Sequence, residues 1–367
     1  MNLAFAIVSL FPHGGLQRDC MAIARLVAAQ GHQVTIFTSR LEGDVGSDLN
    51  VEVLPVLAWT NHGRNAGFSK ALARRCAGRF DRVVGFDKLE HLDILYCADP
   101  PAAPRYTSGL SRFLPRGRKL TSLERACFGR EARTKLLLLS QPQIEAYQQA
   151  WNTQAERITL LPPTINAARR KPQLRSDGTR NWLREEMAVG SKGVLWLAVG
   201  SQPRVKGMDR TLEALEILSD ARLAIVGIAP SSKAGRTLSR MAARQGVGGR
   251  IRLLGVREDI PELMAAADLL VHPARTETTG TVILEAVVNG LPVVASGICG
   301  YAEHVARADA GAVLSEPFAQ GGFVAELRKA QDAALRARWS ENAVRYGETV
   351  DLYRGLIRAA SAIAGQG

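Results

Sequence analysis

Short apolar runs alternate with helical patterns along the chain, and few fold classes are compatible with this alternation. In the first half the runs occupy residues 3–10, 34–38, 51–56, 82–86, 94–98, 135–139 and 158–161. In the second half they occupy residues 194–199, 223–226, 251–254, 269–272, 293–295 and 312–314. The clearest helical segment between them, residues 16–29, is closed by Gly31. Alternation at these lengths predicts βαβ units and parallel sheets, which is the α/β fold class.

A polar, proline-rich stretch at residues 162–172 separates the two series and predicts a connection between two domains. With 367 residues and 46% hydrophobic content, the chain is long enough for two Rossmann-like domains, 1–165 and 166–349. The stretch from Ala330 to Ala364 reads as helix throughout, and we expect a C-terminal helix at about 350–367 to pack back on the first domain. No apolar run reaches about 18 residues, and no basic leader precedes the first strand, so we expect neither a spanning helix nor a secretory signal.

The chain is basic, with 47 Lys and Arg residues against 35 Asp and Glu and a net charge of +12. Nucleic acid, an anionic membrane surface and phosphorylated substrates are partners of suitable charge. From Arg105 to Lys135, nine basic residues face only Glu124 and Glu131, with aromatic residues interleaved. This composition suits a patch on an acidic leaflet, where each basic residue contributes roughly 1 kcal/mol. An ordinary solvated helix face remains the alternative. The five scattered cysteines contain no CxxC pair, which predicts a reducing compartment and no structural zinc.

Two carboxylates, Glu277 and Glu285, follow the apolar run at 269–272 and flank the start of a helix expected from Gly280 to Gly290. Gly280 allows a ligand to approach the free amides of the first helical turn, which suit an anionic or hydroxyl-rich group. Open α/β sheets bind ligands at this carboxyl edge. A sugar nucleotide has the shape to span both carboxylates. The alternative is that Glu277 favours the helix dipole and Glu285 is a solvated residue.

Two further loops follow predicted strands at the same kind of place. Gly14 and Gly15 open a helix after the first strand, where they allow a phosphate or a sugar near the amides, or simply make a tight turn. Arg204 and Lys206 follow the strand at 194–199, where they neutralise a diphosphate leaving group or lie as solvated cations.

Several motifs are missing, and single residues divide between site and core. The chain has no GxxxxGK[ST] motif, no GxGxxG after the first strand and no Asp-x-Asp at a strand end. We therefore expect basic side chains and amides, with no metal ion, to stabilise a leaving group. His62 lies in a polar cluster at 61–65 that marks either a site or a plain turn. His272 is interpreted as a satisfied structural histidine. Four tryptophans are interpreted as packing residues: Trp59, Trp182, Trp196 and Trp339.

These motifs, together with FPHGGLQRD at 11–19, TNHGRN at 60–65, RVVGF at 82–86, LMAAADLL at 263–270 and CGYA at 299–302, resemble a known family. The resemblance is to the retaining glycosyltransferases of family 4, and within it to the bacterial enzymes that glucosylate heptose I of the lipopolysaccharide core. It covers nearly the whole chain. It implies the GT-B architecture, in which two Rossmann-like domains face each other across a cleft.

The resemblance implies roles for individual residues. Glu277 and Lys206 would act in catalysis, the first on the donor sugar and the second on the diphosphate, with Asp19 and Asp99 on the acceptor side near the reacting carbon. Glu285 would bind the ribose diol. The remaining donor-binding positions would be Gly14, Gly15, Arg204, Val256, Arg257, Thr279, Gly280 and Thr281. His62 and Arg64 would lie on the acceptor side.

The implied activity is metal-independent transfer of a hexose, glucose from UDP-glucose, onto a heptose of the lipopolysaccharide inner core. No cofactor beyond the UDP-sugar donor and no nucleic acid partner is implied, and the enzyme would lie in the cytoplasm, peripheral on the inner face of the membrane. The chain departs from the branch at Val205, where the branch has arginine, at Thr278-Thr279, and in the prolines at 100–104. Another donor or acceptor, a sugar-nucleotide epimerase of the same architecture and a nonenzymatic basic module remain alternatives.

Overall fold

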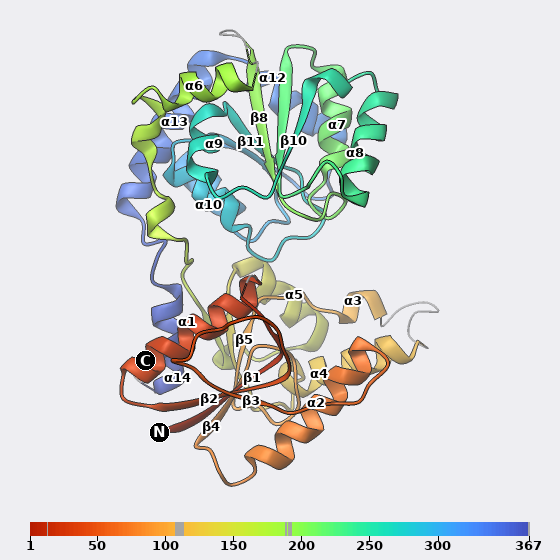
Figure 1. The fold of residues 1–367 in the computed structure, drawn as a ribbon, viewed down its shortest axis with the longest axis vertical. Helices are drawn as coiled ribbons and strands as arrows, with labels where there is room; N and C mark the ends of the chain where they lie inside the picture. The colour runs from red at the N-terminus through yellow and green to blue at the C-terminus, as the bar shows by residue number, and fades with distance from the viewer. Residues whose placement is uncertain (13, 107–113, 188, 190–192, 366–367) are drawn as a thin grey trace. The chain divides into compact units, whose positions relative to one another are not determined.

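The computed structural model describes residues 1–12, 14–106, 114–187, 189 and 193–365. The chain forms two compact units (Figure 1). Unit 1 comprises Met1–Pro163 and Arg354–Gly367, and unit 2 comprises Thr164–Tyr353.

Unit 1 is built on a parallel sheet with the strand order β3-β2-β1-β4-β5-β6-β7. Its strands are β1 (Asn2–Leu10), β2 (Gln33–Leu41), β3 (Asn50–Val53), β4 (Arg82–Gly85), β5 (Ile94–Cys97), β6 (Lys135–Leu138) and β7 (Ile158–Leu160). The helical elements are α1 (Gly15–Ala29), α2 (Asn61–Cys76), α3 (Ala103–Tyr106), α4 (Pro115–Phe128), α5 (Gln141–Trp151), the short 3-10 turn η2 (Ala155–Arg157) and α14 (Gly355–Ala364). The central strands are apolar on both sides because helices cover both faces of a parallel sheet.

The two faces of this sheet have separate cores. On one face α1 packs beside α14, so the last helix shares a core with the first strands (Figure 1). Arg82 ties α14 to β4, since its Nη1 donates to the carbonyl of Ile363 at 2.5 Å. On the other face α2, α4 and α5 contribute Phe68, Phe128 and Tyr147, and the last two rings stack at 3.6 Å.

Unit 2 has a second parallel sheet, with the order β10-β9-β8-β11-β12-β13. Its strands are β8 (Val194–Val199), β9 (Ala221–Val226), β10 (Ile251–Gly255), β11 (Leu269–His272), β12 (Val293–Ser296) and β13 (Gly311–Leu314). Its helices are α6 (Thr179–Glu186), α7 (Met208–Ile217), α8 (Lys233–Arg244), α9 (Ile260–Ala266), α10 (Thr281–Val288), α11 (Ala302–Ala308), α12 (Gln320–Lys329) and α13 (Ala333–Thr349). Short 3-10 turns are η3 (Ala167–Arg169), η4 (Pro172–Arg175) and η5 (Gly248–Arg250).

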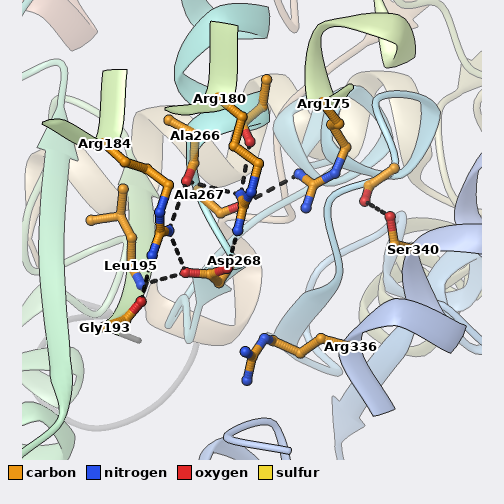
Figure 2. A network of polar contacts seen from close by, with 12 residues as sticks. Arg175, Arg180, Arg184, Gly193, Leu195, Ala266, Ala267, Asp268, Arg336 and Ser340 are labelled. Carbon is orange, nitrogen blue, oxygen red and sulfur yellow. Dashed lines mark hydrogen bonds and ion pairs between the residues drawn. The ribbon is translucent and has the colours of Figure 1, made fainter. Parts of the chain in front are cut away.

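A buried aspartate fastens the first helices of unit 2 to its sheet (Figure 2). Asp268, 6% exposed, accepts hydrogen bonds from Arg180 at 2.5 Å and Arg184 at 2.7 Å, and from the Leu195 amide at 2.8 Å. The arginines, with Arg175, also donate to carbonyls at the end of α9 that have no partner inside the helix. The negative end of the α9 dipole also favours these cations.

The α/β class and the strand pattern predicted from the sequence are confirmed, since each predicted strand overlaps an observed one. Two predictions are wrong. The stretch from Ala330 to Ala364 is not one helix: α13 ends at Thr349 and α14 starts at Gly355. Between them Leu352 is fully buried, and its carbonyl accepts the Ile165 amide at 2.9 Å, which a continuous helix would prevent.

The second error concerns tryptophan. Trp196 and Trp339 are buried in unit 2, as packing residues are. Trp59 is 105% exposed in the loop before α2, and Trp182 is 63% exposed because α6 turns Leu183 and Arg184 inward instead. Among the described residues, no helix has both the length and the apolar character needed to cross a membrane.

Candidate active site

Three side chains meet at the carboxyl edge of the unit 2 sheet. β8 and β11 are neighbours, so the loops that follow them lie together. Lys206, in the loop after β8, forms an ion pair through Nζ with Oε2 of Glu277, in the loop after β11. His272, the last residue of β11, lies 3.1 Å from the same oxygen through Nε2 and is 1% exposed. Both of these partners contact Oε2 of Glu277, and among the described residues no hydrogen bond to its Oε1 is found.

The carboxylate of Glu277 is held in its ionised form. Burial alone would raise its pKa, but the hydrogen bond with His272 and the positive charge of Lys206 outweigh burial, so the pKa lies below its usual value. An ionised carboxylate accepts hydrogen bonds only, which suits recognition of sugar hydroxyl groups.

Backbone contacts keep the two loops in place. The carbonyls of Glu277 and Thr279 accept the amides of Gly300 at 3.2 Å and Tyr301 at 2.8 Å. Gly280 precedes α10 with φ +87°, a left-handed conformation that favours glycine. Gly207 has φ +69°, and a Cβ there would lie 1.9 Å from the carbonyl oxygen of Pro273. Only glycine therefore allows the Lys206 loop to approach the Glu277 loop this closely.

Sequence reasoning missed a clamp between the same loops. Arg275 forms two hydrogen bonds of 2.7 Å with the carboxylate of Asp209, the second residue of α7. Its Nη1 also donates to the carbonyl of Arg204 at 2.9 Å, and its backbone amide donates to the carbonyl of Val205 at 2.8 Å. A bidentate pair of this kind fixes orientation as well as distance. No sequence pattern links positions 209 and 275, so only the folded chain reveals it.

Sequence reasoning also assigned His272 to the core without identifying its partner. The residue is buried and satisfied as expected, yet its partner is Glu277. The sequence did contain a signal for a role at this edge. His272 is the last residue of a buried strand, and open α/β sheets bind ligands outside the carboxyl ends of their strands.

Glu285 lies within α10, with its side chain 13% exposed. Its carboxylate accepts a hydrogen bond of 3.1 Å from Arg169, which belongs to η3 in the segment after the first unit. Asn289 joins the same parts, since its Nδ2 donates to the carbonyls of Arg169 at 2.9 Å and of Glu285 at 2.7 Å. The connecting segment therefore belongs structurally to this site.

The other positions predicted to bind the donor lie in unit 2, after β8, after β10 and at the start of α10. The guanidinium of Arg257 pairs with Asp259, and Val256 is 86% exposed. Arg204 lines a cavity of ≈ 500 Å³ beside α8 together with Lys233. Thr279, Gly280 and Thr281 carry the amides at the start of α10.

In unit 1, the glycine pair begins α1. Gly14 is the residue before the helix and Gly15 its first residue, while His13 lies outside the described residues. A Cβ on Gly14 would lie 1.8 Å from Oε1 of Gln17, whereas a Cβ on Gly15 would have no neighbour within 4 Å. A side chain at position 14 would therefore require the Gln17 side chain and the Phe11 ring to shift, whereas position 15 has room for one.

Asp19 and Asp99 occupy different surroundings in unit 1. Asp19 accepts a hydrogen bond of 2.9 Å from the hydroxyl of Tyr96, and burial raises its pKa. Asp99 follows β5 and lines a cavity of ≈ 390 Å³, while its carbonyl accepts hydrogen bonds from Gln143 and Tyr147.

The polar cluster at 61–65 starts α2, where Thr60 caps the helix by accepting the Gly63 amide. His62 lies 3.2 Å from the Thr60 hydroxyl through Nε2. Arg64 lines a second cavity, of ≈ 320 Å³, together with Asp87 after β4. Burial raises the pKa of Asp87 to about 6, although its carboxylate accepts the Val8 amide at 2.6 Å. Sequence reasoning did not single out Asp87, which lines both cavities.

The basic stretch from Arg105 to Lys135 falls partly outside the described residues, which omit Arg112, Phe113 and the side chain of Arg105. Within α4, the exposed basic residues are Arg116, Arg118, Lys119 and Arg125. Glu124 does not offset them at the surface. It is fully buried, where it accepts hydrogen bonds from Lys88, Trp151 and the Ala102 and Ala103 amides.

The chain is similar to known glycosyltransferases in sequence and in fold. Residues 181–346 match the family model described as glycosyl transferases group 1. The chain is 39% identical over its full length to the lipopolysaccharide glucosyltransferase WaaG of Escherichia coli K12, of which it covers 99%. The crystal structure of WaaG, a glycosyltransferase involved in lipopolysaccharide biosynthesis, superposes with a TM-score of 0.88 over 99% of this chain and 100% of that one. Anabaena HepE in complex with UDP-glucose, 21% identical, shares the fold with a TM-score of 0.71, covering 100% of this chain and 99% of its own.

Proposed function

The chain belongs to the family of glycosyl transferases group 1, and we propose that it moves glucose from UDP-glucose onto a heptose of the lipopolysaccharide inner core. It is a glycosyltransferase of the GT-B fold. Our proposal adds the donor, the acceptor and retention of the anomeric configuration. It is supported by the name of the WaaG relative and by the chemistry of Glu277 and Glu285. We propose no cofactor besides the donor itself.

The observation that carries the proposal is the contact of Lys206 and His272 with one oxygen of Glu277. Glu277 accepts hydrogen bonds from hydroxyls of the donor sugar through its other oxygen. Lys206 reaches the diphosphate, where its charge stabilises the negative charge that develops as the glycosidic bond breaks. In this proposal the ion pair holds the ammonium group, before the donor binds, close to the position that the diphosphate will occupy.

The remaining donor contacts follow from α10. The amides of Thr279, Gly280 and Thr281 have no partners inside the helix and suit anionic or hydroxyl groups. Glu285 binds the ribose diol, with Arg169 holding its carboxylate. Backbone near Val256 and Arg257 meets the base, and Arg204 supplements Lys206 near the phosphates.

Acceptor recognition belongs to unit 1 in this proposal. His62 and Arg64 on α2, and the carboxylates of Asp19 and Asp99, contact the acceptor saccharide. The acceptor hydroxyl attacks on the face that the diphosphate leaves, and a phosphate oxygen takes the proton. We propose that the exposed cations Arg118, Lys119 and Arg125 of α4 attract anionic lipids on the inner face of the cytoplasmic membrane.

A donor screen tests the reaction. The protein is incubated with UDP-, GDP- and ADP-sugars and a heptose-terminated core acceptor, with and without EDTA, and products are identified by mass spectrometry. We expect transfer from UDP-glucose that EDTA does not abolish. Strict dependence on Mn²⁺ would contradict the role given to Lys206, and conversion of a UDP-sugar without acceptor would favour an epimerase instead.

Substitution of Lys206 by alanine tests the residue itself. Loss of one donor to the developing charge typically lowers the rate by roughly 10²-fold or more. Lys329→Ala is the matched control, because the Lys329 side chain is exposed and forms an ion pair with Glu326 of the same helix. A rate for Lys206→Ala close to that of Lys329→Ala would remove Lys206 from the site.

A further inference from the structure

The two cavities of unit 1 adjoin each other at the carboxyl edge of its sheet. Asn65 and Asp87 line both of them. Cations gather around this pair of cavities: Arg40 and Arg64 line one, and Lys88 and Arg116 line the other. The combined site is therefore polar and carries more positive than negative side chains.

The four cations differ in whether the protein already neutralises them. Lys88 donates to Glu124 at 2.7 Å and to the carbonyl of Pro100 at 3.1 Å, and Arg40 forms an ion pair with Glu42. Among the described residues, no hydrogen bond or ion pair joins the side chain of Arg64 or Arg116 to a partner. Within the described part of the chain, the guanidinium groups of Arg64 and Arg116 therefore line the cavities without a protein partner.

The carboxylates that line the cavities do not neutralise these two arginines. Within the described part of the chain, neither Asp87 nor Asp99 forms an ion pair with Arg64 or Arg116. Asp87 is already engaged by the Val8 amide, and burial together with the charge of Asp99 opposes its ionisation. The unused positive charge therefore remains for a ligand.

The cations of α4 lie on different faces of the helix, and only one of these faces lines the cavity. Arg116, Leu120 and Leu123 line the cavity, and their spacing of four and three residues places them on one helix face. Arg118 and Arg125 lie on other faces, and Arg125 stacks its guanidinium 5.3 Å from the Trp151 ring. The basic stretch is thus not a single membrane patch, since Arg116 belongs to the cavity.

We infer that Arg64 and Arg116 recognise acidic groups, carboxylate or phosphate, on the acceptor saccharide. A planar guanidinium binds either group through two parallel hydrogen bonds, which gives both affinity and orientation. Arg64 and Arg116 thereby select an acidic saccharide over a neutral one, while Asn65 and Asp87 between them meet hydroxyl groups. This inference rests on the proposed function, because it names the chemistry of that acceptor.

The test uses a soluble, delipidated core saccharide as acceptor, so that no membrane takes part. Arg64→Gln and Arg116→Gln are each expected to raise the KM for this acceptor roughly 10-fold or more, as loss of a hydrogen bond to a charged group does. The KM for the UDP-sugar and kcat should stay within about twofold of wild type, because no donor contact changes. Arg74→Gln, on the exposed last turn of the same helix as Arg64, is the matched control and should match wild type.

Modified acceptors identify the acidic group. One acceptor is treated with phosphatase, and another has its carboxyl groups reduced. The modification that removes the recognised group should raise the KM of the wild type for the acceptor. The variant of the arginine that binds this group should show no further rise in KM with the modified acceptor. If both modified acceptors bind the wild type as well as the acidic parent does, the inference is wrong.

Two other results would also overturn it. Equal KM values for Arg116→Gln, Arg74→Gln and wild type on the soluble acceptor would return Arg116 to the membrane patch, especially if the variant weakened retention on vesicles of anionic lipid. A rise in donor KM equal to the rise in acceptor KM would indicate a general disturbance of the fold. Absence of transfer by the wild type to any saccharide would instead reject the proposed function, so the two failures remain distinct.

Discussion

Replacing Asp268 with asparagine should strongly destabilise unit 2. The carboxylate accepts hydrogen bonds from Arg180, Arg184 and the Leu195 amide through both of its oxygens (Figure 2). Asparagine retains one acceptor oxygen and brings an NH₂ group toward a guanidinium. Breaking a buried ion pair by removing one partner costs about 3–5 kcal/mol, because the remaining charge stays buried without compensation.

The carbonyls at the end of α9 reduce this cost. Arg180 keeps its bonds to Ala265, Ala266 and Ala267, and Arg184 keeps its bonds to Ala266 and Gly193. Arg184 is 9% exposed and Arg180 is 24% exposed, so water reaches the second more easily. We therefore expect a loss near the lower limit, about 3 kcal/mol in the free energy of unfolding.

The loss should depend on pH in a defined direction. Burial raises the pKa of Asp268, but the charge of Arg180, the Leu195 amide and Arg184 outweigh burial, so the pKa in the folded chain lies below its usual value. Stability from such a group is fully present above the unfolded pKa and is lost as pH falls through the folded pKa. The difference between wild type and variant should be constant above about pH 5 and shrink in more acidic solution.

Urea unfolding with hydrogen exchange measures the effect. Exchange of the Leu195 amide and of the α9 segment reports unit 2 alone, which matters because a chain of two units need not unfold in one step. Glu303→Gln is the control, because its pair with Arg307 is exposed and such pairs contribute about 0–1 kcal/mol. A loss below about 1 kcal/mol for Asp268→Asn, equal to the control, would refute the reasoning.

Three further predictions concern the sites. Arg275→Gln should lower kcat/KM by roughly 10-fold, since it frees the Lys206 loop and Asp209 from the loop that carries Glu277, and circular dichroism should show that unit 2 remains folded. Asp87→Asn should stabilise unit 1 by about 1–3 kcal/mol at pH 8 but not at pH 4. The pKa of Asp87 in the folded chain is raised to about 6, so its ionisation lowers stability as the pH rises through that value. Equal thermal midpoints for variant and wild type at pH 8 would contradict this. Glu277→Gln should abolish transfer at pH 7. Because the pKa of Glu277 is lowered, its protonation should not reduce the wild-type rate above about pH 5. A fall of the wild-type rate on acidification near pH 6 that is absent from the residual activity of the variant would disprove this.

Much of the architecture was accessible from the pattern of residues. A parallel strand is covered on both faces, so it appears as an uninterrupted apolar run such as residues 194–199 or 269–272, and both runs coincide with observed strands. The expected positions of Lys206 and Glu277 rest on the same logic, since each follows a strand. Their proposed roles remain predictions.

The exposed tryptophans show where such reasoning fails. Aromatic content favours burial on average, but whether a given ring is buried depends on which face its helix turns inward. Trp182 and Leu183 are neighbours, and α6 buries only the second. The break between α13 and α14 has a similar origin, because Leu352 leaves the helical path to pack and pair with the segment near Ile165.

The pattern of residues was enough to predict the α/β class, the strand positions, the loops that carry Lys206 and Glu277 and the helix that carries Glu285, because period, length and glycine placement are local properties. The folded structure alone reveals that His272 and Lys206 share one oxygen of Glu277, that Arg275 binds Asp209, and that Arg116 and Arg64 line two adjoining cavities. These contacts join residues far apart in the chain or depend on the rotation of a helix. No local pattern encodes them, since the free energy that selects them comes from burial and charge in the folded units.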